Sequence, residues 1–401
     1  MSALARELQL RGHRVTWFHV PDLEAKIRSA GFDFCPLGLS DHPPGSLNES
    51  FERLGRLHGM AAVRFTIQAV ARTSEMFCRE GPEAIRKANI DALLVDQMEP
   101  AGGTIADHLG VPFITICNAL AINHDPAIPP PFTPWRYRDH PGFATRMRNR
   151  IGYAMGDRTT IPITRVIAKY RRAWKLPPLA TPDDSFSRLA QICQMPRELD
   201  YPRTTLPSSF HYVGPLREPT ETTPFPWDRL DSLNGRRLVY ASLGTLQNRR
   251  PGLLRTIAAA CARTDVQLVI SHGGGLSDEQ AGALPGSPIV VPYAPQRALI
   301  ARASLTITHA GLNTVLDSLA AGVPLITIPI TYEQPAISRR VERTGAGAVI
   351  AFADLREDTL RDLSLKVLNS ADYHNAAQRM ASSIASAGGV ARAADIALTV
   401  L

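Results

Sequence analysis

The chain has 401 residues, of which 44% are hydrophobic and 20% charged, and a formal net charge of +7. This composition is typical of a soluble globular protein with room for two α/β domains, and it excludes a disordered chain. No apolar run reaches the ~20 residues of a membrane-spanning helix, and we expect no signal peptide.

The five cysteines are widely scattered and include no CxxC pair. This spacing argues against a disulfide framework and against a structural zinc site. The sequence therefore predicts free thiols and a cytoplasmic protein.

The first twenty residues predict a helix, a cap at Gly12 and then a strand, because the pattern changes from helical to β-branched at that glycine. A doubly wound domain normally begins with a strand that lies in the middle of its sheet. We therefore expect the first strand of the N-terminal domain to be missing and the natural chain to begin further upstream.

Short apolar runs alternate with helical segments along both halves of the chain. The strand-like runs are residues 15–20, 32–37, 91–96 and 112–117, followed by 238–242, 266–271, 289–293, 305–308 and 325–330. Such alternation predicts parallel sheets that helices cover on both faces.

The segment between the two halves is rich in Pro and Thr and has no periodicity, which is typical of a linker. We expect an α/β protein with two Rossmann-like doubly wound domains that face a cleft. The predicted domains are residues 1–216 and 237–401, the linker is 217–236, and the last helix packs back on the N-terminal domain.

The positive charge is concentrated between Arg136 and Lys175, where eleven Lys and Arg residues face two acidic residues. Such a segment can attract an acidic substrate or an anionic membrane surface, or it can be a solvated helix face. It matches no DNA- or RNA-binding module, so we expect no nucleic-acid partner.

A β-α-β pattern at residues 308–334, "THAGLNTVLDSLAAGVPLITIPITYEQ", carries an unusual set of polar side chains. His309 follows a strand, Gly311 allows a tight turn, and a helix begins near Asn313. The open N–H groups and the positive dipole end of that helix make this junction a candidate anion site, to which His309 can add a ring N–H.

Asn313 and Thr314 can add side-chain donors, and Asp317 lies one turn later on the same helix face, where it can accept hydrogen bonds from hydroxyls. Glu333 and Gln334 follow the next strand, at the same carboxyl edge of the sheet. Each residue alone could be a cap or a solvated side chain. Together at one sheet edge they predict a site for a ligand with phosphates and hydroxyls, such as a nucleotide sugar.

These residues resemble the donor-binding signature of the nucleotide-sugar-dependent glycosyltransferases with the GT-B fold. The matching motifs are "YAPQ" at 293–296, "HAGLNTVLD" at 309–317, "GVP" at 322–324 and "YEQ" at 332–334, together with "YASLGT" at 240–245. More narrowly, the motifs and the segment "PAGGTIADHLGVPFITICNAL" are similar to those of the bacterial zeaxanthin glucosyltransferases.

The resemblance implies the roles of individual residues. Tyr293 would stack on uracil, Gln296 would lie beside the base and ribose, and Asp317 would bind the ribose hydroxyls. Glu333 and Gln334 would bind the hexose hydroxyls, which points to glucose and hence to UDP-glucose as the donor. The residues implied around the diphosphate are His309, Gly311, Asn313 and Thr314, with Ser242 and Thr245 on a second strand-loop.

The implied reaction is a direct displacement that inverts the anomeric carbon of the sugar. The helix N-terminus and His309 would stabilise the leaving diphosphate, so we expect neither a metal nor another cofactor. The family orients a histidine base with an aspartate, and Asp96 matches that catalytic aspartate. The histidine has no counterpart: His13 and His19 do not match its place, and we leave the base unassigned.

The acceptor is less clear from the sequence. A Pro- and aromatic-rich stretch at 118–143 predicts an apolar wall, suited to a hydrophobic hydroxylated acceptor such as zeaxanthin. We expect segment 136–175, with Trp135, Tyr137 and Trp174, to dock peripherally on the anionic inner face of a membrane. The alternatives are a transferase for a soluble macrolide- or flavonoid-type aglycone, and a non-catalytic nucleotide-sugar-binding protein.

Overall fold

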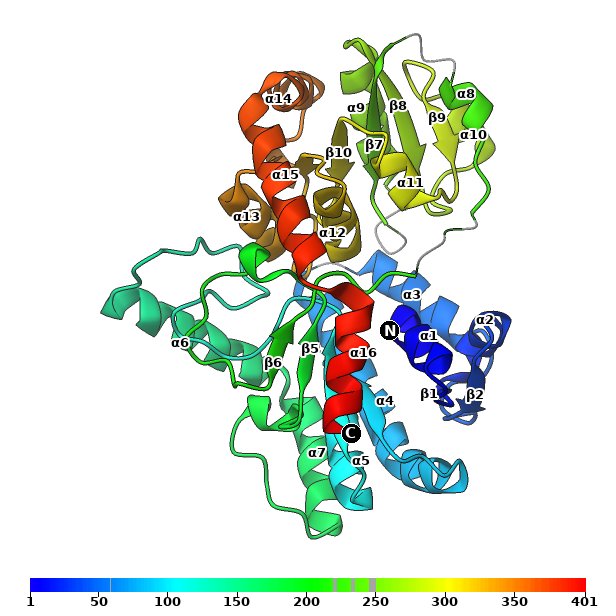
Figure 1. The fold of residues 1–401 in the computed structure, drawn as a ribbon, viewed down its shortest axis with the longest axis vertical. Coiled ribbons are helices and arrows are strands. Elements are labelled where there is room, and N and C mark those ends of the chain that lie inside the picture. The colour runs from blue at the N-terminus through cyan, green and yellow to red at the C-terminus, as the bar shows by residue number, and fades with distance from the viewer. Residues whose placement is uncertain (58, 219–220, 222, 232–234, 245–249) are drawn as a thin grey trace.

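The computed structural model describes residues 1–57, 59–218, 221, 223–231, 235–244 and 250–401. Figure 1 shows two α/β units, one above the other, and both ends of the chain lie in the lower, N-terminal unit. The domain limits expected from the sequence stay a prediction.

The strands of the C-terminal unit form one parallel sheet in the order β12-β11-β10-β7-β8-β9. These strands are β7 (Arg237–Ser242), β8 (Val266–Ser271), β9 (Ile289–Val291), β10 (Leu305–Thr308), β11 (Leu325–Thr327) and β12 (Gly347–Val349). In register, Thr308 at the end of β10 lies between Ser242 of β7 and Thr327 of β11. The loops that follow these three strands therefore leave the sheet at the same edge.

Helices cover both faces of this sheet, as its continuous apolar strands predict. They are α8 (Trp227–Asp231), α9 (Pro251–Ala262), α10 (Asp278–Gly282), α11 (Gln296–Ile300), α12 (Leu312–Ala320), α13 (Gln334–Thr344) and α14 (Glu357–Asn369), with the short 3₁₀ helix η4 (Phe352–Asp354). The helix expected to begin near Asn313 is α12, and it begins one residue earlier.

The N-terminal strands form two separate parallel sheets, β1-β2 and β3-β4-β5-β6. The strands are β1 (Thr16–His19), β2 (Asp33–Pro36), β3 (Leu93–Asp96), β4 (Phe113–Cys117), β5 (Gln191–Cys193) and β6 (Phe210–Tyr212). Among the described strands, β1 pairs with β2 and β3 pairs with β4, but β1 and β3 do not pair with each other. An absent strand of this domain stays a prediction.

Helices surround these two sheets. They are α1 (Ser2–Leu10), α2 (Glu24–Ser29), α3 (Ser46–Arg56), α4 (Gly59–Lys87), α5 (Ala101–Leu109), α6 (Phe143–Thr159) and α7 (Ile161–Ala173), with the 3₁₀ helices η1 (Pro21–Leu23), η2 (Pro182–Ser185) and η3 (Arg197–Leu199). Helix α4 packs against α5 and α7, and α6 reaches out to the left in Figure 1.

The two units share buried apolar surface. Leu120 and Met195 of the N-terminal unit belong to one core cluster with Val315 of α12 and Met380 of α15 (Ala371–Ser386). The last helix, α16 (Gly389–Val400), packs against α1. This shared core fixes the loops of the C-terminal sheet edge opposite the N-terminal unit.

Candidate functional site

His309 lies at the end of β10, with only 9% of its surface exposed. Burial lowers the pKa of its imidazole to about 4 and outweighs a hydrogen bond with the backbone of Ser242. A Cβ atom added to Gly311 would lie 2.6 Å from Cε1 of this ring, and one added to Gly244 would lie 2.9 Å from the same atom. The two glycines therefore make the space for a neutral His309, whose single N–H can donate either to the Ser242 carbonyl or to a ligand, but not to both.

The N-terminus of α12 opens beside this ring. Gly311 is its N-cap and provides no side-chain hydrogen bond to the first turn. Ala310, between the histidine and the cap, adopts a left-handed backbone with φ of 68°, which is uncommon for a residue with a Cβ. The first amide groups of α12 are thus aimed out of the sheet edge without a capping side chain, as in an anion-binding site.

Three predicted donor-binding residues, Gln296, Thr314 and Asp317, contact one another beside the first turns of α12. Gln296 at the start of α11 donates from Nε2 to Oδ2 of Asp317 over 2.7 Å, and its Oε1 accepts from Thr314 Oγ1 over 3.2 Å. Tyr240 of β7 also contacts Oε1 of Gln296, at 3.4 Å. The carboxylate and amide groups are therefore held in place before any ligand arrives.

The remaining predicted donor residues differ in how deeply they are buried. Ser242 is buried at the end of β7, whereas Tyr293 is 58% exposed, and Tyr293 and Glu333 both line the large cavity described below. Gln334 is buried, and its Oε1 accepts from the backbone N–H groups of Ile330 and Thr331. Because Oε1 is already occupied, only the Nε2 atom of Gln334 is left to contact a sugar.

Thr245, the other residue expected near the phosphates, lies outside the described residues. The residue that precedes Glu333, Tyr332, has a φ of 53°. Ala310 and Tyr332 are thus two non-glycine residues in the left-handed region, each after a strand that ends at the same sheet edge.

The predicted linker, residues 217–236, supplies a residue to which no sequence pattern points. Arg217 donates from Nε to Oδ1 of Asp317 over 2.6 Å and from Nη2 to the carbonyl oxygen of Asn313 over 3.1 Å. Its Nη1 contacts Oε1 of Gln194, which follows β5, and Gln194 in turn donates to Oδ1 of Asn313. Because the linker has no periodicity, no local pattern places Arg217 against α12.

Asp96, the predicted catalytic aspartate, ends β3 and is half-buried. Its Oδ2 accepts from Nδ2 of Asn118 over 2.7 Å, and its Oδ1 accepts from the backbone N–H of Met98 over 2.8 Å. Gln194 also donates to the carbonyl oxygen of Asn118, so the same polar connection runs from Asp317 to Asp96. Asp96 itself is not among the residues lining the cavity, but its neighbours Gln97 and Met98 are.

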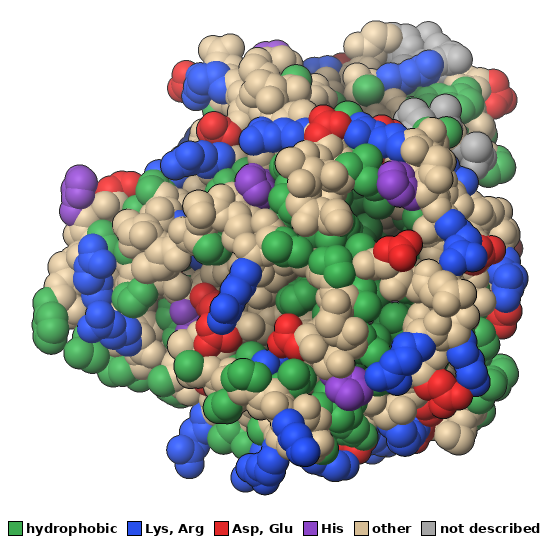
Figure 2. Space-filling view, turned by 60° about the horizontal axis from the view of Figure 1, so that its bottom comes forward, with side chains coloured by type: hydrophobic (Ala, Val, Ile, Leu, Met, Phe, Trp, Pro, Cys, Tyr) green, Lys and Arg blue, Asp and Glu red, His purple; other side chains and the backbone are tan. Residues whose placement is uncertain are grey.

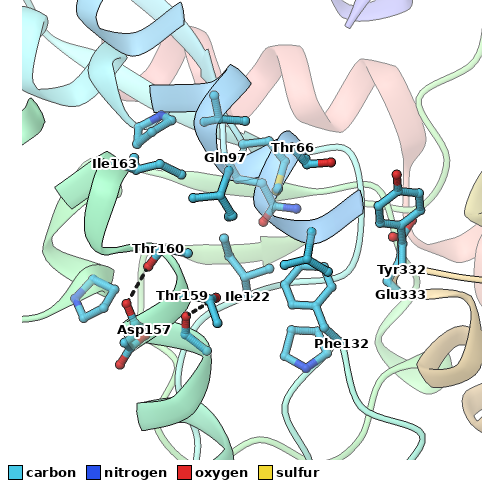
Figure 3. A pocket seen from close by; sticks show the side chains of 18 of the residues that line it. Thr66, Gln97, Ile122, Phe132, Asp157, Thr159, Thr160, Ile163, Tyr332 and Glu333 are labelled. Atoms are coloured by element: carbon cyan, nitrogen blue, oxygen red, sulfur yellow. Dashed lines mark hydrogen bonds between the residues drawn. The ribbon is translucent and has the colours of Figure 1, made fainter. Parts of the chain in front are cut away.

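A cavity of about 2580 Å³ lies between the two units. Its N-terminal wall comes from α3, the start of α4, residues 122–135, α6 and α7, and its C-terminal wall includes Tyr293 and residues 330–333. Figure 3 shows Tyr332 and Glu333 on one side of it and Ile122 and Phe132 nearer its centre. The apolar wall expected from residues 118–143 is therefore part of this cavity.

A histidine–carboxylate pair that was not predicted from the sequence also lines the cavity. Nε2 of His124 lies 3.3 Å from Oδ1 of Asp157, whose pKa is raised by burial and lowered in part by His124. Asp157 lies on the side of the cavity opposite Glu333 (Figure 3). Because Asp157 and His124 lie far apart in the sequence, no local motif predicts that they form a pair.

His19 does not line the cavity. It ends β1, burial lowers its pKa, and its Nδ1 accepts from the backbone N–H of Val20. Within the described residues, no group of three or more His, Cys, Asp or Glu side chains is arranged to hold a metal ion, and no helix is long and apolar enough to cross a membrane.

The family described as UDP-glucoronosyl and UDP-glucosyl transferase matches residues 48–386. The chain belongs to this family. It is thus a glycosyltransferase, an enzyme of the class that the donor-edge motifs predict.

Two curated relatives of this glycosyltransferase match it over nearly their whole length. The zeaxanthin glucosyltransferase of Pantoea ananas is 37% identical over 395 residues, which cover 98% of this chain and 90% of the relative. The zeaxanthin glucosyltransferase of Pseudescherichia vulneris is 35% identical over 405 residues, covering 99% and 93%. The narrower resemblance seen in the motifs is therefore confirmed.

The fold agrees with this assignment. The crystal structure of CalG4, the calicheamicin glycosyltransferase, superimposes with a TM-score of 0.75 at 22% identity, covering 100% of this chain and 94% of that one. The glycosyltransferase therefore has the two-domain GT-B fold, with its cavity between the domains.

Proposed function

We propose that this enzyme transfers glucose from UDP-glucose to a hydroxyl of a hydrophobic acceptor such as zeaxanthin, with inversion at the anomeric carbon. The observation that carries the proposal is the arrangement at the C-terminal sheet edge. There, the open N-terminus of α12, the neutral His309 and the Gln296–Asp317 pair lie together, beside a large cavity between the domains. The two zeaxanthin glucosyltransferase relatives support the choice of acceptor.

The donor would lie along this edge. Tyr293 would stack on uracil, Gln296 and Asp317 would hold the ribose, and Asn313, Thr314 and the amide groups of α12 would hold the diphosphate. Ser242 of β7 lies in register with the end of β10 and would add a hydroxyl to the phosphate site. Glu333 and the Nε2 atom of Gln334 would contact the hexose hydroxyls.

In the reaction, the acceptor oxygen forms a bond to the anomeric carbon while the bond from that carbon to the diphosphate breaks. Negative charge develops on the leaving diphosphate, where the positive end of α12 and the His309 N–H stabilise it without a metal. The acceptor proton passes to a general base. Asp96 would orient or assist that base, whose identity stays unassigned.

The proposal places the protein in the cytoplasm, at the inner face of a membrane that holds the acceptor. All five cysteines are free thiols, which supports a reducing compartment. The cavity is large and mainly lined by apolar groups on its N-terminal wall, which suits a long hydrophobic molecule.

The test is turnover of UDP-glucose and zeaxanthin in detergent, with the glucoside measured by mass spectrometry and its anomeric configuration by NMR. We expect a β-glucoside and released UDP. The variant His309→Ala should lower kcat about a hundredfold or more, because it removes a donor aimed at the leaving group.

Parallel reactions with UDP-galactose and with a soluble flavonoid acceptor define the specificity. Faster transfer to the flavonoid would contradict the hydrophobic acceptor. UDP-glucose binding without any transfer would instead show a nucleotide-sugar-binding protein.

A further inference from the structure

Helix α6 exposes its apolar residues and buries polar ones. The only buried residues of this 17-residue helix are Asn149 and Tyr153. On the opposite side, four large apolar residues spaced four apart are exposed: Phe143 by 77%, Met147 by 38%, Ile151 by 53% and Met155 by 65%. Helical residues four apart lie on one face, so these side chains form a continuous outward stripe.

The polar side of α6 attaches the helix to the protein. Nδ2 of Asn149 donates to the carbonyl oxygen of Pro126 over 2.9 Å, and the ring of Tyr153 packs 4.3 Å from that of His124. A surface helix of a globular protein normally turns its apolar stripe toward the core. Here the contacts fix the opposite orientation, so the exposed stripe is a built feature of the fold.

Basic side chains surround the stripe. At about 100° per residue, Arg148 and Arg150 fall on either side of it, while Arg146 and Arg158 are exposed near its two ends. The one acidic residue of α6, Asp157, is paired with His124. Figure 2 shows hydrophobic side chains with Lys and Arg beside them along the left edge of the molecule, where α6 lies in Figure 1.

The stripe is continuous with the cavity between the domains. Trp135 and Met155 line both that cavity and the shallow apolar groove over α6, which Phe143, Met147 and Ile151 also line. The guanidinium of Arg148 lies 4.8 Å from the centre of the Trp135 ring. The groove over α6 and the cavity between the domains therefore share a border at these two apolar residues.

We propose that the exposed face of α6 lies in the headgroup layer of an anionic membrane, with Phe143, Met147, Ile151 and Met155 inserted toward the acyl chains and the arginines at the lipid phosphates. The charge of this face selects an anionic surface over a neutral apolar partner. The shared apolar border at Trp135 and Met155 selects a bilayer, from which a hydrophobic acceptor would reach the cavity. The inference rests on the proposed function only for the role of the cavity.

This surface differs from the one that the basic segment alone predicts. Tyr137 stacks on Tyr201 with 4.4 Å between ring centres, and Trp174 stacks on His108 at 4.1 Å. Both rings stack on other rings of the same protein, and their contact with lipid stays a prediction. We assign the insertion into lipid to the exposed residues of α6 instead.

The test is co-sedimentation with vesicles of phosphatidylglycerol and phosphatidylcholine, compared with vesicles of phosphatidylcholine alone. We expect the protein to prefer the anionic vesicles at low salt. The double variant Phe143→Asp/Ile151→Asp should lower partitioning about tenfold or more, and Arg146→Glu/Arg150→Glu should remove the preference for anionic lipid. The matched control is Leu10→Asp/Leu398→Asp, which charges two exposed apolar residues of α1 and α16 and should leave binding unchanged.

Turnover separates this inference from the proposed function. With detergent-solubilised zeaxanthin, the Phe143→Asp/Ile151→Asp variant should match the unchanged protein, whereas with zeaxanthin in anionic vesicles it should be at least about tenfold slower. Equal vesicle binding by all variants would overturn the inference, as would a dimer that dissociates in the α6 variants and does not bind vesicles. Vesicle binding without transfer in either medium would overturn only the proposed function.

Discussion

Two of the polar connections between the N-terminal and C-terminal domains differ in burial. In the first, Asp200 accepts from Nε of Arg203 over 2.6 Å and from Nε of Arg340 in α13 over 2.9 Å. The side chains of Asp200, Arg203 and Arg340 are 0%, 2% and 1% exposed. Tyr212 donates a third hydrogen bond to Asp200.

The second connection is the one at the donor edge, from Asp317 through Arg217 and Gln194 to Asn118 and Asp96. Here Arg217 is 22% and Asp317 7% exposed. The contacts made by Gln194 within this connection include 3.3 Å from its Nε2 to Asn313 Oδ1 and 3.2 Å from Arg217 Nη1 to its Oε1.

The difference indicates two roles. A buried charge that loses its partner is not compensated by water, and the loss costs free energy. The Asp200 network therefore holds the two domains in one relative position. The second connection is partly exposed at Arg217, which can exchange a protein partner for a ribose or phosphate group, so this connection can respond to the donor. The first connection should therefore affect stability and the second should affect donor binding.

The largest expected effect is that of Arg340→Met. This change leaves Asp200 buried with one of its two cationic partners missing, and breaking a buried pair in this way costs about 3–5 kcal/mol. Urea unfolding followed by circular dichroism measures the loss. A loss below about 1 kcal/mol, the level of a surface ion pair, would show that the network does not fix the domains.

The stability that the Asp200 network contributes should depend on pH. Burial opposes the charge of Asp200, but Arg203 and Arg340 outweigh it and hold the pKa of Asp200 below its ordinary value. A carboxyl group with a depressed folded-state pKa contributes stability that is present above its unfolded pKa of about 3.9 and is lost as the pH falls below that value.

We therefore expect the free energy of unfolding of the unchanged protein to fall more steeply below about pH 4 than that of Asp200→Asn. Parallel curves for the two proteins between neutral and acidic pH would contradict this expectation.

A smaller effect is expected at the donor edge. Arg217→Met removes the cation that holds the Asp317 carboxylate and should raise the KM for UDP-glucose by about tenfold or less, with little change in the free energy of unfolding. Arg236→Met is the matched control, because Arg236 lies in the same linker but donates to Gln267 of β8. Equal KM values for the two variants would assign Arg217 a structural role only.

Local patterns in the sequence predict most of the fold and most of the donor edge. The residues from His309 to Asp317 belong to one β-α-β unit, so the spacing along the chain determines their positions. The strands β5, β6 and β12, of three residues each, were missed.

The missed contacts depend on how distant segments pack. Arg217 reaches Asp317 only because the linker crosses beside α12, and His124 meets Asp157 only because α6 packs on the loop after β4. Helix α6 also shows why periodicity is insufficient. Its apolar residues four apart predict a buried face, but Asn149 and Tyr153 take the inner positions.

The most direct test of the account is calorimetric titration of UDP-glucose into the unchanged protein, His309→Ala, Asp317→Asn and Arg340→Lys. We expect binding to the unchanged protein and to Arg340→Lys, which keeps a positive charge beside Asp200. We expect binding about tenfold weaker or more for His309→Ala and Asp317→Asn, which alter the donor edge. Equal affinity in all four proteins would contradict a donor site at the N-terminus of α12.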